Sequence, residues 1–113
     1  MKKQIIFGQP SIGKEEISYI TKVVRKYKKS KYALSVNSCT AALHLSLIYC
    51  GVKSNDEVIT TPMTFASTIN SIAMLGAKPI LADINPETFN IDPKNIEKKI
   101  TKKTKALVVV HFA

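Results

Sequence analysis

Hydrophobic positions along the chain alternate between helical spacing and short continuous runs. Apolar side chains recur every three or four positions over residues 13–28, which predicts an amphipathic helix. Four short aliphatic runs farther on predict strands, and the segments between them show helical spacing or helix-start signals. The expected strands cover residues 32–36, 57–60, 79–83 and 106–111, and the expected further helices cover residues 40–49, 65–75 and 92–100.

This pattern orders the elements as α, then β-α-β-α-β-α-β. Strands that are continuously aliphatic, rather than alternating, are typical of a parallel sheet covered by helices on both faces. The sequence therefore predicts an α/β fold, with a three-layer α/β/α architecture and a mostly parallel sheet.

Local residues suggest where several helices begin and end. We expect Ser11 near the N-cap of the first helix, and Asp92 as the cap of the last, with Pro93 at its first position. Gly51 follows the second helix as a C′ glycine would. We also expect Ile48 to face inward and Cys50 to be a small core residue.

Composition excludes several classes of protein. With 113 residues and 45% hydrophobic content, the chain is long and apolar enough for one domain with a core. No apolar run approaches the ~20 residues of a membrane span, and the run at residues 5–7 is too short for a signal peptide. We therefore expect a cytoplasmic protein with no membrane partner. Cys39 and Cys50 have neither disulfide-framework nor metal-site spacing, so no metal is expected.

The formal net charge of +9 raises nucleic acid as a partner. Sixteen of the seventeen basic residues are Lys, however, and only Arg25 carries the guanidinium that usually recognises bases and phosphates bidentately. The lysines gather at residues 22–31 and 94–105, which we interpret as solvated faces. We expect no nucleic-acid partner.

The candidate site lies where ligands bind in open α/β sheets, beyond the carboxyl ends of the strands. A helix that begins at Ser38-Cys39-Thr40-Ala41 offers free N–H groups, the positive end of a dipole and hydroxyl donors. Together these suit a phosphate or carboxylate. Plain N-capping by Ser38 or Thr40 explains the same residues without a ligand, and both interpretations stay open.

Other residues at the same edge carry weaker signals. Phe65 opens a helix after a run of threonines, and it is either a core residue, the default for Phe, or a lid over a flat ligand ring. His111 ends a buried strand and is either structural or catalytic. Asp83 is interpreted as a cap for the next turn.

Several motifs, in order, resemble one family over nearly the whole chain. They are Ile6 to Gly13 with the two following glutamates, VNSCTAALHLSL, DEVITTPMTFASTINSIAMLGAKPILADINPETFNIDP and ITKKTKALVVVHF. The chain resembles the DegT/DnrJ/EryC1/StrS family of pyridoxal-phosphate-dependent nucleotide-sugar aminotransferases. The resemblance implies the large domain of the aspartate-aminotransferase type. We expect residues 1–113 to form a single partial domain, with an N-terminal segment and helix over 1–31 and the β-α-β-α-β-α-β part over 32–113.

The resemblance also implies a cofactor, site residues and partners. The cofactor is pyridoxal 5'-phosphate, with its phosphate held at Cys39, Thr40 and Ala41 and its ring stacked on Phe65; Phe7 maps loosely to the sugar pocket. The family transfers an amino group, typically from glutamate, to a nucleotide-linked keto sugar, in surface-polysaccharide or amino-sugar biosynthesis, and usually acts as a homodimer.

The chain also departs from the family pattern. None of its residues occupies the motif of the lysine that binds the coenzyme covalently, so no catalytic residue is carried over. The segment from Lys28 to Tyr32 is shorter than in family members, and Asn55 stands where they usually have Gly, a change that Asn tolerates in the left-handed region. We therefore expect an N-terminal portion of such an enzyme that is inactive by itself. The alternatives are a basic α/β module that binds nucleotides or nucleic acid, and an interaction fragment that complements a separate C-terminal half.

Overall fold

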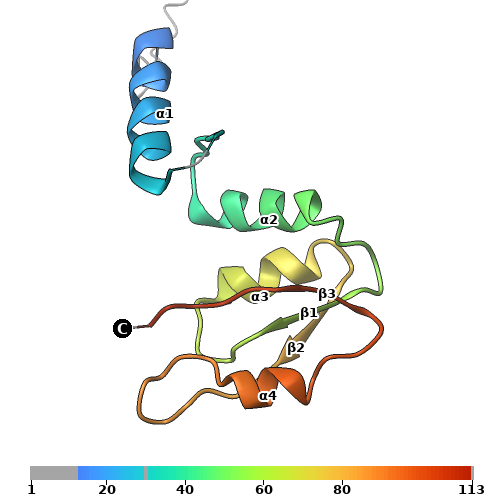
Figure 1. Ribbon diagram of the computed structural model, residues 1–113. Helices are drawn as coiled ribbons and strands as arrows, with labels where there is room; N and C mark the ends of the chain where they lie inside the picture. Colours follow the sequence, from blue (N-terminus) through green and yellow to red (C-terminus); the bar gives the residue numbers. More distant parts are fainter. Residues whose placement is uncertain (1–12, 30, 113) are drawn as a thin grey trace, which may run out of the picture. The chain divides into compact units, whose positions relative to one another are not determined.

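A computed structural model describes residues 13–29 and 31–112 of the chain (Figure 1). The chain divides into two compact units, residues 1–36 and 37–113. Helix α1 (Lys14–Lys28) belongs to the first unit. That all 113 residues form a single partial domain stays a prediction.

The second unit alternates helices and strands. Its elements are α2 (Cys39–Tyr49), β1 (Glu57–Thr60), α3 (Ala66–Ala73), β2 (Lys78–Leu81), α4 (Pro93–Glu97) and β3 (Thr104–Leu107). The strands form a parallel sheet in the order β2-β1-β3, with Thr60 opposite Leu81 on one side and Ile59 opposite Leu107 on the other. Figure 1 shows α2 and α3 on one face of this sheet and α4 on the other. The predicted three-layer α/β/α architecture is confirmed.

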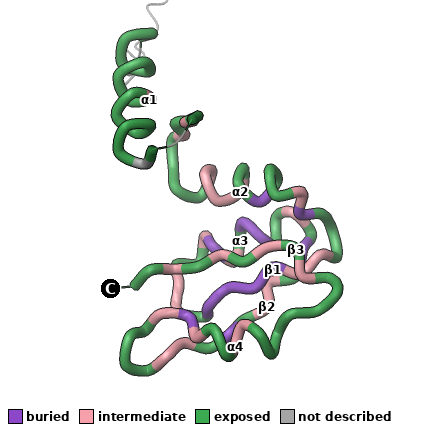
Figure 2. Tube along the Cα trace, in the orientation of Figure 1, coloured by how far each residue is buried: buried purple, intermediate pink, exposed green. Residues whose placement is uncertain are grey.

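Strand β1 lies at the centre of the core, and most of its trace is coloured as buried (Figure 2). Its side chains contribute to both faces of the sheet. Val58 and Ile59 are fully or almost fully buried, and neighbouring residues of a strand point to opposite faces. Val58 packs with residues of the α2 and α3 layer, namely Leu47, Val52, Ile72 and Ala77. Ile59 packs on the other face, where its neighbours are Ala82, Ile91, Ile80 and Ile96. Two apolar clusters therefore hold the three layers together.

Glycines follow both α2 and α3, and the one after α2, Gly51, is where the sequence predicts it. Gly51 has a φ of 73°, and its N–H donates to the carbonyl of Ile48 at 2.9 Å. The N–H of Val52 donates to the carbonyl of Leu47 at 3.1 Å, which completes a Schellman cap. Gly76 has a φ of 70° after α3, a conformation that side chains with a Cβ rarely adopt.

The start of α4 is capped as the sequence predicts, and the start of α1 has a different local arrangement of hydrogen bonds. Asp92 accepts a hydrogen bond from the N–H of Lys94 at 2.9 Å, and Pro93 occupies the first helical position. The N-cap of α1 is Gly13, whose N–H donates to the carboxylate of Glu16 at 2.7 Å. Ser11, the expected cap, lies outside the described residues.

The strand boundaries differ more from expectation than the helix boundaries do. The expected strand at 32–36 is wrong, since these residues pair with no strand among the described residues. The strands expected at 79–83 and 106–111 instead form at 78–81 and 104–107. A strand forms only where a neighbouring strand pairs with it, and β1 provides four residues for pairing. The apolar residues after Leu107 therefore extend beyond most of the ladder.

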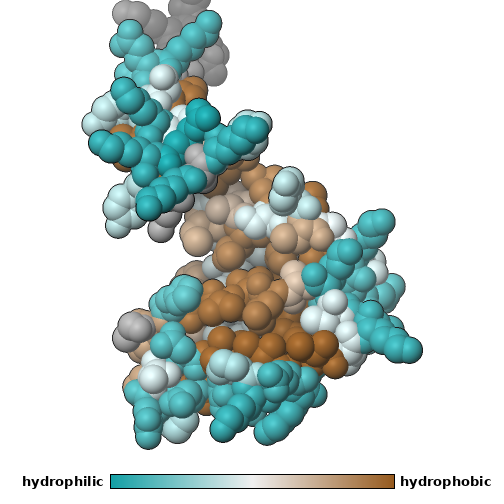
Figure 3. All heavy atoms as spheres, viewed as in Figure 1, coloured by the Kyte–Doolittle hydropathy of each residue, from teal (hydrophilic) through white to brown (hydrophobic). Residues whose placement is uncertain are grey.

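Several hydrophobic side chains that were expected to pack are exposed. Ile48 is half exposed, and Cys50 is exposed at the end of α2, so neither is the core residue that was expected. The apolar positions of α1, including Ile17 and Val23, are also exposed. In Figure 3 hydrophobic atoms cover much of the visible middle of the second unit. No helix within residues 13–29 or 31–112 is long and apolar enough to cross a membrane.

Candidate functional site

The candidate site is the edge of the sheet where the first turns of α2 and α3 lie. Five residues separate the end of β1 from the start of α3, so the first turn of α3 follows the carboxyl end of the central strand. Helices α2 and α3 pack against each other and point their first turns to the same side in Figure 1. This is the edge at which ligands bind in open α/β sheets.

The first turn of α2 leaves two backbone donors without an internal acceptor. Ser38 is the N-cap; its Oγ accepts from the N–H of Ala41 at 3.2 Å, and its carbonyl accepts from the N–H of Ala42 at 3.1 Å. Within the described residues no acceptor bonds the N–H of Cys39 or Thr40. Both of these residues are exposed. The capping interpretation is confirmed for Ser38, and two N–H groups remain available to an anion.

Phe65 lies at the start of α3 with 80% of its surface exposed. The default expectation, that this Phe belongs to the core, is wrong. Its backbone is the N-cap of α3, in an extended conformation, and its side chain belongs to neither buried cluster. An exposed aromatic ring at the ligand edge suits contact with a flat ligand.

Hydroxyl groups fix the loop between β1 and α3. Thr60 is buried and donates through Oγ1 to the carbonyl of Val108 at 3.0 Å, which ties the carboxyl ends of β1 and β3 together. Thr61 is also buried, and its Oγ1 accepts from the N–H of Met63 at 3.1 Å. The hydroxyls of Thr64 and Thr68 lie 2.8 Å apart. The run of threonines is visible in the sequence, but its local pattern does not predict these hydrogen bonds.

No hydrogen bond within the described residues joins the weaker candidates to Cys39, Thr40 or Phe65. Asp83 is exposed, and its backbone carbonyl accepts from the N–H of Asp92 at 3.0 Å, while no capping bond from its carboxylate is found in the described part. His111 is exposed at the end of the chain, next to Phe112, whose N–H donates to Asn90 at 3.0 Å. Phe7 lies outside the described residues.

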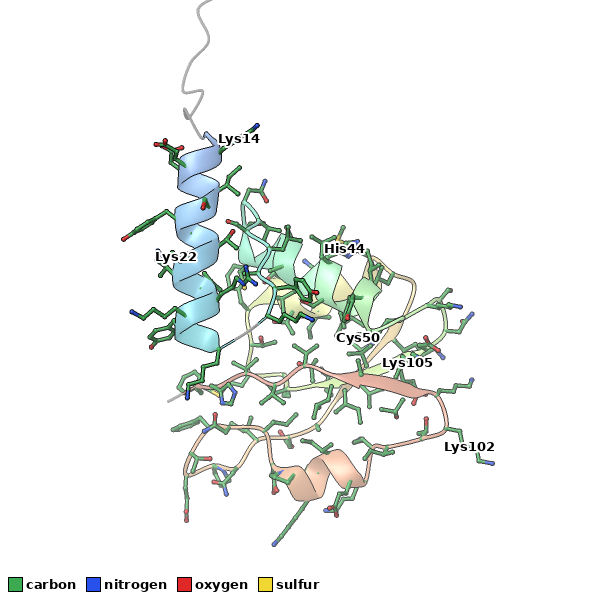
Figure 4. All side chains as sticks on the ribbon, turned by 45° about the horizontal axis from the view of Figure 1, so that its top comes forward. Lys14, Lys22, His44, Cys50, Lys102 and Lys105 are labelled. Atoms are coloured by element: carbon green, nitrogen blue, oxygen red, sulfur yellow. The ribbon has the colours of Figure 1, made fainter. Side chains whose placement is uncertain are left out.

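Two lysines of the group at residues 94–105 lie at the end of the sheet opposite the candidate site. Lys102 and Lys105 point outward near the amino end of β3, away from the first turns of the two helices (Figure 4). The charges of these two lysines are therefore separate from the free N–H groups of Cys39 and Thr40.

A pocket of about 280 Å³ lies on the α4 side, and its lining residues are Pro62, Leu81, Asp83, Asn95, Lys98 and Lys99. The described residues contain no group of three His, Cys, Asp or Glu that could hold a metal ion.

Sequence reasoning missed one histidine that is half-buried. His44 lies on α2 (Figure 4), and its Nδ1 is buried with no hydrogen-bond partner among the described residues. The signal in the sequence is a His within a mostly apolar helix.

Known proteins match this chain over most of its length. The model of the DegT/DnrJ/EryC1/StrS aminotransferase family matches residues 7–113. The spore coat polysaccharide biosynthesis protein SpsC of Bacillus subtilis is 44% identical over 94% of this chain. The alignment covers 32% of SpsC, so the chain spans about a third of the length of this relative. It also runs over 124 positions, more than the 113 residues present here, so SpsC has residues that this chain lacks.

Solved structures agree in fold. NtdA of Bacillus subtilis, with bound PMP cofactor, superposes with a TM-score of 0.82 at 38% identity, over 85% of this chain and 22% of NtdA. DesV of S. venezuelae superposes with a TM-score of 0.84 at 31% identity, over 89% of this chain and 27% of DesV.

Proposed function

The chain belongs to the DegT/DnrJ/EryC1/StrS aminotransferase family, and on that premise we propose that it forms part of the coenzyme site of a sugar aminotransferase. The reaction transfers an amino group, with glutamate as donor, to a nucleotide-linked keto sugar. One observation carries the proposal. The unbonded N–H groups of Cys39 and Thr40 and the exposed ring of Phe65 belong to the first turns of two packed helices at one sheet edge.

Pyridoxal phosphate combines the two chemistries that these residues suit, a dianionic phosphate and a flat aromatic ring. The N–H groups of Cys39 and Thr40, together with the Thr40 hydroxyl, would bind the phosphate at the positive end of α2. Phe65 would cover one face of the ring. The N–H of Ala41 donates to Ser38, so Ala41 would join the phosphate site only after Ser38 turns away. When bound, the coenzyme supplies the electron sink for amino transfer.

The rest of the proposal follows from family membership. Phe7 would contribute to the sugar pocket, the enzyme would act as a homodimer in the cytoplasm, and the product would serve surface-polysaccharide or amino-sugar biosynthesis. The name of the relative SpsC supports the last point. Residues 1–113 include no lysine at the family's coenzyme-binding position, so we propose that they do not transaminate by themselves.

The test compares two exposed phenylalanines of the same unit. Pyridoxamine phosphate is the probe, because it lacks the aldehyde that would react with the sixteen lysines of the chain. The Phe65→Leu variant should bind it roughly two- to tenfold more weakly, as expected for a lost ring contact. The matched variant Phe89→Leu should bind it as the unmodified chain does, since the ring of Phe89 contacts the tilted ring of Phe112 instead.

Binding is measured by the fluorescence of the probe, at two salt concentrations. Equal affinities for the Phe65→Leu and Phe89→Leu variants would overturn the proposal. Affinity for an unrelated oligonucleotide that exceeds affinity for the probe, and that falls steeply with salt, would favour a basic nucleic-acid module instead.

A further inference from the structure

Two threonines on either side of Phe65 in the sequence form a hydrogen bond with each other through their hydroxyl groups. Thr64 precedes Phe65, and Thr68 is the third residue of α3; their Oγ1 atoms are 2.8 Å apart. The side chain of Thr68 is buried, with 5% of its surface exposed, and Thr64 is half-buried. A hydrogen bond at this distance between partly buried hydroxyls is well formed.

This pair has a local consequence for Phe65. The N-cap position normally carries a side chain that bonds the first turn of the helix, and Phe65 has no such group. The Thr64–Thr68 bond spans the N-cap instead and links the loop to the third residue of the helix. The N–H of Thr68 also donates to the carbonyl of Phe65 at 3.0 Å. The backbone of Phe65 is therefore held at both sides while its ring remains exposed.

The loop before Thr64 is fixed as well. The N–H of Thr64 donates to the carbonyl of Pro62 at 3.1 Å, and the buried Thr61 hydroxyl accepts from the N–H of Met63. Both of these hydrogen bonds lie within the loop. Among the described residues, the side-chain hydrogen bond that joins the loop to α3 is the one between Thr64 and Thr68. Without this hydrogen bond, the backbone at Phe65 would be free to change the angle at which the chain enters α3.

We propose that Thr68, acting through the hydroxyl of Thr64, is a positioning residue that holds the Phe65 ring in place for the coenzyme. The identity of the ligand rests on the proposed function above. The placement of the ring does not, because it follows from the hydrogen bond and from the exposure of Phe65.

Two substitutions separate the hydroxyl from the shape of the side chain. Thr68→Val keeps the branched shape and removes the hydrogen bond, whereas Thr68→Ser keeps the hydroxyl and removes a methyl group. A residue that only fills space in the core would be affected more by the Ser variant. A positioning residue would be affected more by the Val variant, with rescue by Ser.

The first readout needs no coenzyme. The chain has no tryptophan, so Phe65→Trp introduces a single indole at the site, and its emission is followed separately from that of the four tyrosines. In that background, time-resolved fluorescence anisotropy should show larger local motion of the indole with Thr68→Val than with Thr68→Ser. Far-UV circular dichroism checks that both variants remain folded. Should Thr68→Val fail to fold, the same comparison is made with Thr64→Val and Thr64→Ser.

The second readout separates ring binding from phosphate binding, with Phe65 intact. Thr68→Val should weaken binding of pyridoxamine phosphate roughly three- to tenfold, in line with the loss of one hydrogen bond. Binding of inorganic phosphate, which needs only the first turn of α2, should not change. Thr68→Ser should bind both probes as the unmodified chain does.

The outcomes are distinct. Equal indole mobility in the Val and Ser variants would overturn the positioning role, whatever happens to the coenzyme. A clear difference in mobility, in a chain that binds no pyridoxamine phosphate at all, would support the positioning role and refute the proposed function. An equal loss of affinity for both probes in Thr68→Val would show general damage and would also overturn the inference.

Discussion

Replacing Ser38 by Ala should destabilise the chain through the first turn of α2. The Ser38 Oγ accepts a hydrogen bond of 3.2 Å from the N–H of Ala41, and the site is exposed. Loss of such a cap costs about 1 kcal/mol. Since Leu47 of α2 packs with Val58 and Ile72 in the core, this cost should appear in global unfolding. The urea midpoint should therefore fall by roughly 0.3–1 M with an unchanged slope, as followed by circular dichroism.

The same helix offers a matched control. Ser46 donates to the carbonyl of Ala42 at 2.7 Å, a back-bond that competes with the helix rather than capping it. Ser46→Ala should therefore leave the midpoint unchanged or raise it slightly, because Ala has the higher helix propensity. If Ser38→Ala is as stable as Ser46→Ala, the reasoning that Ser38 caps α2 is refuted.

Three further changes have clear expected results. Gly76→Ala should lower the free energy of unfolding in urea more than Gly51→Ala does. Both glycines have a positive φ, where a Cβ costs about 1–2 kcal/mol. A Cβ at Gly76 would in addition lie 2.9 Å from the Ser54 hydroxyl. Similar losses would contradict this. Ile72→Ala should cost about 2–5 kcal/mol, because the side chain is fully buried; a loss below about 1 kcal/mol would show that the site collapses around the change. Thr40→Val should weaken binding of inorganic phosphate about tenfold in calorimetry, while Thr40→Ser should not, and equal binding by both would exclude the hydroxyl from the phosphate site.

The sequence predicts those features that depend on neighbouring residues. Asp92-Pro93 begins α4 and Gly51 ends α2 because caps depend on a few adjacent side chains and on a positive φ. Asn55 adopts the expected left-handed conformation, with a φ of 70°. The continuous apolar run of β1 marks a strand covered on both faces, and its bounds, Glu57–Thr60, are those expected.

Features that depend on distant residues are not in the local pattern. The apolar run after residue 106 suggested a strand up to residue 111, but β1 fixes how many residues can pair. Residues 32–36 have strand composition without a strand partner in the described part. Whether Phe65 is buried or exposed depends on the path of the loop, which the threonine hydroxyls determine. The mapping of Cys39, Thr40, Ala41, Phe65 and Phe7 to a coenzyme and sugar site remains a prediction.

The most direct test of the central claim follows the backbone N–H groups of the chain by nuclear magnetic resonance during titration with pyridoxamine phosphate. We expect saturable shifts that are largest at Cys39 and Thr40, with ring-current changes on the Phe65 side chain. Inorganic phosphate should shift the two amides and leave Phe65 unchanged. Shifts that concentrate instead on the lysines of residues 94–105, or that are absent at the first turn of α2, would contradict the account.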